Sequence, residues 1–111
     1  MSCLKHTARL KTKDEFSEVY SSRKRFHTKF FVLFYSKKGD LKAGFTASKK
    51  VGNAPQRNYA KRRLRALYQE YCNKLKAGHF VFVAKKDLLQ DNFAEIKKDF
   101  EFALKKLELL K

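Results

Sequence analysis

The sequence predicts an α+β fold: a single α/β sandwich domain with about four strands and three helices, in the order helix, strands, helix, strand, helix. Two observations predict it. In three segments apolar residues recur at steps of three or four, which is typical of amphipathic helices, and runs of aromatic and β-branched residues lie between those segments, which is typical of strands. At 111 residues the chain is long enough for one core and too short for two, so residues 1–111 are expected to form one domain.

The first segments are a tail, a short helix and a region of undecided structure. Residues 1–11 are basic and are expected to form a flexible tail. Thr12 and Glu15 have the spacing of a capping box, which predicts a helix over about residues 13–22. Residues 23–27 form either a short strand or an extended basic arm, because their local pattern fits both.

Three apolar segments are expected to be strands: Phe30–Tyr35, Leu41–Ser48 and His79–Ala84. The second and third should lie parallel, because a long helix connects them. On physical grounds alone, that helical crossover would be right-handed.

The connecting helix is expected to begin at Asn53 or Ala54, with Pro55 in its first turn. It should run to about Lys76, where Ala77-Gly78 ends it. A last helix is expected from about residue 92. Its apolar face consists of Phe93, Ile96, Phe100, Leu104 and Leu107.

Positive charge is concentrated around the connecting helix. The chain has a net charge of +16, and residues 41–69 contain eight Lys or Arg and no Asp or Glu. On a helical wheel one ridge consists of Arg57, Lys61 and Arg65, with Asn58 and Arg62 beside it. No glutamate stands four residues away to pair with these cations, so a merely solvated surface is the weaker interpretation. The expected partner is RNA or DNA; a membrane fits poorly, because no stretch approaches about 20 apolar residues.

The sequence predicts no catalytic or metal centre in the protein itself. His6, His27 and His79 are scattered, and no paired carboxylates accompany them. Cys3 and Cys72 are far apart and form no CxxC motif, so neither a disulfide nor a zinc site is expected. The N-terminus lacks the apolar run of a signal peptide, which favours a cytoplasmic location.

The central motif is specific enough to indicate a family. The order Ser48-Lys49-Lys50-Val51-Gly52-Asn53-Ala54, followed by Arg57-Asn58 and Lys61-Arg62-x-x-Arg65, closely resembles the signature of the bacterial ribonuclease P protein component. The resemblance extends to Leu10-Lys11, Phe16-x-x-Val19-Tyr20 and Phe31–Phe34, and covers most of the chain up to about Lys86. Two positions depart from it. Tyr59 stands where the usual Arg-Asn-Arg box has its second arginine, and Arg63 is a nearby cation that could restore the charge, though on another face of the helix. Pro55 is also unusual in the family, but it fits the first turn of a helix.

The resemblance implies a protein that binds a large catalytic RNA and helps it remove 5′ leaders from precursor tRNAs. In that family the RNA performs the chemistry, so Mg²⁺ is expected for the RNA-containing holoenzyme and no cofactor for the protein alone. The implied partners are the catalytic RNA and precursor tRNA, with no membrane and no obligate protein partner. The resemblance also implies the rare left-handed version of the crossover, which we adopt.

The resemblance also implies two groups of binding residues. Those expected to face the catalytic RNA, or metal ions near it, are Lys49, Lys50, Asn53, Arg57, Asn58, Lys61, Arg62 and Arg65. Those expected to line a cleft for the single-stranded leader are Phe16, Tyr20 and Phe34, and strand alternation adds Phe30 and Val32 to the face of Phe34. Core packing is the alternative for these apolar side chains. Two alternative functions are a ribosomal or other structural RNA-scaffold protein and a nuclease that acts without RNA.

Overall fold

The computed structural model describes residues 8–22, 24–89 and 93–110. The described helices and strands, in chain order, are β1 (Ala8–Arg9), α1 (Lys13–Tyr20), β2 (Lys24–His27), β3 (Phe31–Ser36), β4 (Leu41–Ala47), α2 (Ala54–Tyr71), β5 (Gly78–Ala84) and α3 (Phe93–Lys106). Short 3₁₀ helices follow α2 at Cys72–Lys74 and β5 at Lys86–Leu89. This order confirms the predicted α+β class.

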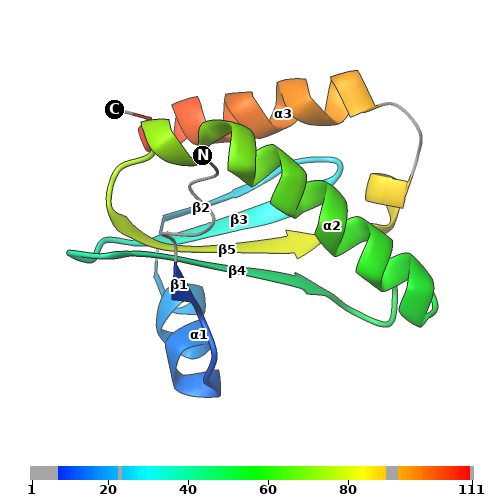
Figure 1. The fold of residues 1–111 in the computed structure, drawn as a ribbon, viewed down its shortest axis with the longest axis horizontal. Helices are drawn as coiled ribbons and strands as arrows, with labels where there is room; N and C mark the ends of the chain where they lie inside the picture. The colour runs from blue at the N-terminus through cyan, green and yellow to red at the C-terminus, as the bar shows by residue number, and fades with distance from the viewer. Residues whose placement is uncertain (1–7, 23, 90–92, 111) are drawn as a thin grey trace.

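The strands form one mixed sheet in the order β1-β4-β5-β3-β2. β4 and β5 are parallel neighbours joined through α2, as predicted, while β3 pairs antiparallel with both β5 and β2. Helices α2 and α3 cover one face of the sheet and α1 lies on the other (Figure 1). The left-handed connection between β4 and β5 stays a prediction.

The N-terminal segment corrects the expectation of a flexible tail over residues 1–11. Residues 8 and 9 form β1, which pairs parallel with β4 opposite Lys42 and Ala43. The backbone N–H of Leu10 donates to the carbonyl of Ala43 at 3.2 Å, and the Leu10 side chain is buried. The sheet therefore has a fifth, two-residue strand beyond the four predicted. Residues 1–7 lie outside the described ranges.

Helix α2 begins where the sequence predicted but ends earlier than predicted. Asn53 is the N-cap, and its side-chain oxygen accepts from the backbone N–H of Gln56 at 3.0 Å. The α-helix ends at Tyr71 rather than near Lys76, because the chain tightens there into a 3₁₀ turn. Gly78 does not end the helix; it opens β5, and its N–H donates to the Asp40 carbonyl at 2.9 Å.

Cys72 corrects a second expectation. It lies directly after α2, is almost fully buried and is disulfide-bonded. The sequence had predicted no disulfide. Cys3, the other cysteine of the chain, lies outside the described residues.

The main core fills the space between the sheet and the helices α2 and α3. Tyr68 of α2 packs against strand residues Phe45, Phe80 and Phe82, with ring-centroid distances of 5.6, 6.3 and 5.9 Å. Phe100 of α3 stacks on Phe82 at 5.1 Å. These contacts hold both helices on one face of the sheet, because aromatic side chains bury large apolar areas.

Phe30 belongs to this core, so its assignment to the leader cleft is wrong. Its side chain is fully buried within the main cluster. The strand begins only at Phe31, because the Thr28 hydroxyl oxygen accepts from the backbone N–H groups of both Phe30 and Phe31 at 3.1 and 3.0 Å. This turn interrupts the alternation that would have placed Phe30 on the same face as Phe34.

A smaller cluster holds α1 on the opposite face. Val19 of α1 is fully buried against Leu10 and Val81. The predicted capping box is confirmed: Thr12 accepts from the Glu15 N–H at 3.1 Å, and the Glu15 carboxylate accepts from the Thr12 N–H at 3.2 Å. Glu15 also binds Lys42 of β4 at 2.9 Å, so one side chain both caps α1 and ties it to the sheet.

Replacing Phe30 with Ala is expected to lower the free energy of unfolding by about 3–5 kcal/mol, because it empties part of a packed core. Phe102→Ala is the matched control, since Phe102 is 56% exposed. Urea unfolding followed by circular dichroism measures both. Equal losses in the two variants would contradict the core position of Phe30.

The Glu15 ion pair predicts a pH-dependent stability. The hydrogen bond from Lys42, followed by those from the backbone of Lys11 and Thr12, lowers the pKa of Glu15 from 4.5 to about 2. A carboxyl whose pKa is lower in the folded state stabilises that state fully above its unfolded pKa and loses the effect as pH falls through the folded pKa. The stability difference between wild type and Glu15→Gln should therefore be constant above about pH 5 and shrink between about pH 4.5 and 2. Thermal unfolding across this range measures it, and a difference independent of pH would refute the assignment.

Candidate nucleic-acid interface

The basic ridge of α2 lies next to the buried side of the helix. Ala60, Leu64, Leu67, Tyr68 and Tyr71 are buried against the sheet and α3. This packing fixes the rotation of the helix, so the cations of the ridge lie at the surface beside its buried side. They line a shallow depression of about 570 Å³ formed by Pro55, Asn58, Lys61, Arg62 and Arg65.

The cations of this ridge are available for a ligand. Asn58 and Arg62 are exposed, while Arg57, Lys61 and Arg65 are partly exposed. Within the described ranges no ion pair involves any of these cations, since the salt bridges found there use lysines and a histidine elsewhere. The structure thus brings Asn58, Lys61, Arg62 and Arg65 together at one depression, with Arg57 in the first turn of the same helix.

The turn before α2 carries the remaining predicted RNA-binding residues. Lys49 and Lys50 are exposed, while Val51 between them and the helix is buried and anchors the turn. Gly52 has φ +153°, and a Cβ at this position would collide with the Gln56 side chain that completes the cap. Asn53 has a structural role as N-cap, so its side-chain oxygen is already engaged by the helix.

Tyr59 and Arg63 form a separate structural unit beside the ridge. The Arg63 guanidinium donates to the carbonyl of Leu88 at 3.1 Å and lies over the rings of Tyr59 and Phe93 at 5.2 and 5.4 Å. Arg63 therefore links α2 to the segment after β5. It does not replace the charge of the arginine expected at position 59, because it points toward another part of the molecule.

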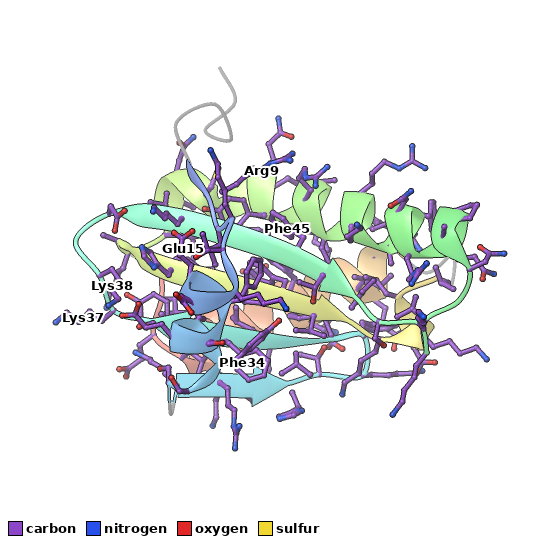
Figure 2. The ribbon with its side chains drawn as sticks, turned by 90° about the horizontal axis from the view of Figure 1, so that it is seen from below. Arg9, Glu15, Phe34, Lys37, Lys38 and Phe45 are labelled. Carbon is purple, nitrogen blue, oxygen red and sulfur yellow. The ribbon has the colours of Figure 1, made fainter. Side chains whose placement is uncertain are left out.

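Three of the predicted cleft residues meet on the α1 face of the sheet. The rings of Phe16 and Tyr20 lie 6.2 Å apart, and Tyr20 meets Phe34 of β3 edge-on at 5.0 Å. Figure 2 shows Phe34 beside α1 on this face. Tyr20 is 37% exposed, so its ring is accessible to a ligand.

A hollow of about 410 Å³ lies against these aromatic residues. Its lining consists of Lys11, Thr12, Lys13, Phe16, Ser17, Tyr20 and Thr46. Gly44 of β4 makes the arrangement possible, because a Cβ there would lie 2.7 Å from the Phe16 ring. Val32 shares the face of Phe34 through strand alternation but is only 8% exposed.

Sequence reasoning missed Lys11, Lys13 and Arg9 as candidates. Lys11 and Lys13 flank the hollow, and Arg9 stands on β1 at the edge of the sheet. All three lie next to the buried Leu10 and the α1 cap. The sequence signal for them was the apolar Leu10 between the cations Arg9 and Lys11, which is typical of a short strand. We did not use this signal, because residues 1–11 were expected to form a flexible tail.

The two described histidines, His27 and His79, lie on different strands. Within the part of the chain that the structure describes, no group of three or more His, Cys, Asp or Glu could hold a metal ion. His79 binds Asp40 through Nε2 and Oδ1 at 2.9 Å, and this contact holds the pKa of Asp40 below its usual value. His27 is exposed on β2, and His6 lies outside the described residues. None of the helices in the described ranges has the length and apolarity needed to cross a bilayer.

Comparisons with known proteins agree with this geometry. The family model "Ribonuclease P" matches residues 4–108. A ribonuclease P protein component from a Nitratiruptor species is 46% identical over 105 residues, covering 95% of this chain and 96% of that protein. One from Bacillus velezensis is 33% identical over 111 residues, covering 97% and 96%.

Two solved structures have the same fold. The RNase P protein of Staphylococcus aureus superposes with a TM-score of 0.83 at 22% identity, covering 95% of this chain and 99% of that one. The Thermotoga maritima RNase P protein gives a TM-score of 0.76 at 23% identity, covering 88% and 96%. The two structural matches show the shared fold, and the family model and the sequence identities show homology. The chain therefore belongs to the ribonuclease P protein family.

Proposed function

We propose that this protein binds the catalytic RNA of ribonuclease P through the ridge of α2 and the single-stranded 5′ leader of precursor tRNA through the aromatic face beside α1. The observation that carries the proposal is the presence of two different surfaces on one small body. One is a rigid helix face of cations, and the other is an accessible aromatic cluster flanked by lysines. Cations at fixed spacing suit a folded RNA backbone, and aromatic rings suit unstacked bases.

The ridge supplies affinity without sequence specificity. Each Lys or Arg that neutralises a phosphate releases a counterion, so binding weakens steeply with salt. Asn58 stands among these cations and can donate or accept hydrogen bonds at the sugar or a base edge. A shape-specific contact to one folded RNA is consistent with this combination.

The aromatic face supplies contact with the leader. Tyr20 can stack on a base while its edge contact with Phe34 keeps the ring in place. Lys11 and Lys13 line the same hollow and can neutralise the phosphates of the stacked nucleotides. The site would therefore accept many leader sequences, because stacking is tolerant of base identity.

The chemistry in this proposal belongs to the RNA. The scattered histidines and the ion-paired carboxylates of the described residues offer no general base next to a nucleophile site. The Mg²⁺ required by the holoenzyme would be bound mainly by its RNA, and the protein alone would bind no cofactor. The proposed partners are the catalytic RNA and precursor tRNA in the cytoplasm, without a membrane or an obligate protein partner.

Reconstitution tests the assignment directly. The purified protein alone should leave a precursor tRNA intact, whereas the protein with the catalytic RNA of the same organism and Mg²⁺ should release the 5′ leader faster than that RNA alone at low Mg²⁺. Gel separation of end-labelled precursor measures this. Turnover by nuclease-treated protein would favour an autonomous nuclease, and a lack of any stimulation would favour a scaffold role.

The two surfaces are expected to separate in a pair of variants. Arg57→Gln with Arg62→Gln should weaken binding to the catalytic RNA and reduce the salt slope of log K by about 0.7–0.9 for each phosphate that is no longer neutralised. Tyr20→Ala should leave that binding unchanged and reduce the preference for precursor over mature tRNA by about tenfold, within the roughly 1–3 kcal/mol of one base stack.

Each variant controls for the other, and Lys98→Gln with Lys106→Gln on α3 matches the charge change of the ridge pair. Filter binding at several salt concentrations measures the constants. If the α3 pair weakens catalytic-RNA binding as much as the ridge pair does, the ridge has no special role.

A further inference from the structure

A small depression lies at the sheet edge where β1 ends. It measures about 200 Å³, and its lining consists of Arg9, Leu10, Phe16, Ala43, Gly44, Phe45, Lys61 and Arg65. The three cations come from two elements, β1 and α2, that are far apart in the sequence. Figure 2 shows Arg9 extending from β1 beside α2. We call Arg9, Lys61 and Arg65 the edge cations.

The fold holds these cations in place. Arg9 is one residue from the buried Leu10, whose N–H donates to β4, so the backbone beneath Arg9 is fixed. The Arg65 guanidinium lies over the Phe45 ring, 5.6 Å from its centroid, in a cation–π contact. Phe45 in turn packs on Tyr68 in the main core. Arg9 is therefore positioned by the backbone of β1 and Arg65 by its contact with Phe45.

The electrostatics of the depression are unbalanced. Its described lining contains no carboxylate, and burial, followed by the charge of Arg9, lowers the pKa of Arg65. Like charges brought together at a partly buried place repel each other. An anion at this point would relieve the repulsion and would gain charge-assisted hydrogen bonds from two planar guanidinium groups, which match phosphate oxygens well.

The depression also joins the two surfaces described above. It shares Phe16 with the hollow beside α1, and it shares Lys61 and Arg65 with the ridge depression of α2. It lies at the sheet edge between the two faces, because β1 covers the edge of β4 only as far as Ala43. An RNA strand can pass from one surface to the other over this edge, because the depression adjoins both.

We propose that the edge cations clamp one phosphodiester group of the RNA at the point where the strand crosses from the α2 ridge to the aromatic face. This inference rests on the proposed function and adds Arg9, on the short strand β1, as a binding residue. The phosphate belongs either to the leader of the precursor or to the catalytic RNA. Both offer the same chemistry to the clamp, and binding measurements distinguish them.

The first test needs no ribonuclease P RNA. Inorganic pyrophosphate that binds the native chain raises its melting temperature by mass action. The rise should be smaller for Arg9→Gln than for Lys98→Gln, which removes the same charge from the exposed side of α3. Arg9 is exposed and β1 pairs through its backbone, so Arg9→Gln should fold normally. Equal rises in the two variants would overturn the clamp.

The second test uses the RNAs and a double-mutant cycle. Arg9→Gln should weaken binding about tenfold and lower the salt slope of log K by about 0.7–0.9, as expected when one phosphate is no longer neutralised. Because Arg9 and Arg65 hold the same phosphate, Arg9→Gln with Arg65→Gln should weaken binding by less than the product of the two single effects. Multiplicative effects would show independent contacts and overturn the shared clamp.

The identity of the bound RNA decides which constant changes. A leader phosphate predicts weaker binding of precursor tRNA by the holoenzyme, with unchanged binding of mature tRNA and of the catalytic RNA. A phosphate of the catalytic RNA predicts weaker binding of that RNA. If leader removal is not stimulated by wild type but the pyrophosphate difference is present, the proposed function fails and the anion site stands. If stimulation is present and Arg9→Gln behaves like Lys98→Gln throughout, the clamp fails and the function stands.

Discussion

The parallel pairing of β4 and β5 is the constraint on which the rest of the structure depends. Two adjacent parallel strands need a connection that returns along the sheet, and α2 supplies it. Tyr68 packs this helix against three aromatic residues of the strands, Phe45, Phe80 and Phe82. With that side fixed, Lys61, Arg62 and Arg65 lie together on the surface beside it, while Arg63 binds the Leu88 carbonyl, so packing of the core determines the geometry of the basic surface.

The second face of the sheet is packed differently from the first, because α1 covers only part of it (Figure 1). The cluster under α1 is small and rests on Leu10, Val19 and Val81. The Glu15–Lys42 contact and the absence of a side chain at Gly44 allow the helix to lie close to the sheet. The uncovered remainder leaves Tyr20 accessible beside Phe34, so incomplete coverage of the sheet produces the aromatic surface that we propose as the leader site.

Local signals predicted most of this structure. The capping box at Thr12 placed the beginning of α1, and Pro55 just after Asn53 placed that of α2. Apolar periodicity separated the packed side of α2 from its basic ridge. Predictions failed where interactions other than the local pattern of apolar residues and helix caps decide the outcome. Residues 8 and 9 form a strand only because β4 offers a free edge, and Thr28 ends the alternation before Phe30 through side-chain hydrogen bonds that no periodicity reveals. The direction of Arg63 likewise depends on a carbonyl 25 residues away.

The distribution of acidic groups explains how so basic a chain remains compact and still presents a positive surface. The carboxylates that form ion pairs in the described ranges stand on α1, at the β3–β4 turn, at the end of α2 and on α3, where they offset neighbouring basic side chains. None stands along the N-terminal half of α2. Ion pairs therefore reduce the repulsion between basic side chains in those regions. Around the N-terminal half of α2 the positive charge is not offset, so the electrostatic potential there is high and attracts a polyanion. A net charge of +16 opposes folding through repulsion between like charges. Bound RNA neutralises part of this charge, so RNA binding and the stability of the fold are linked.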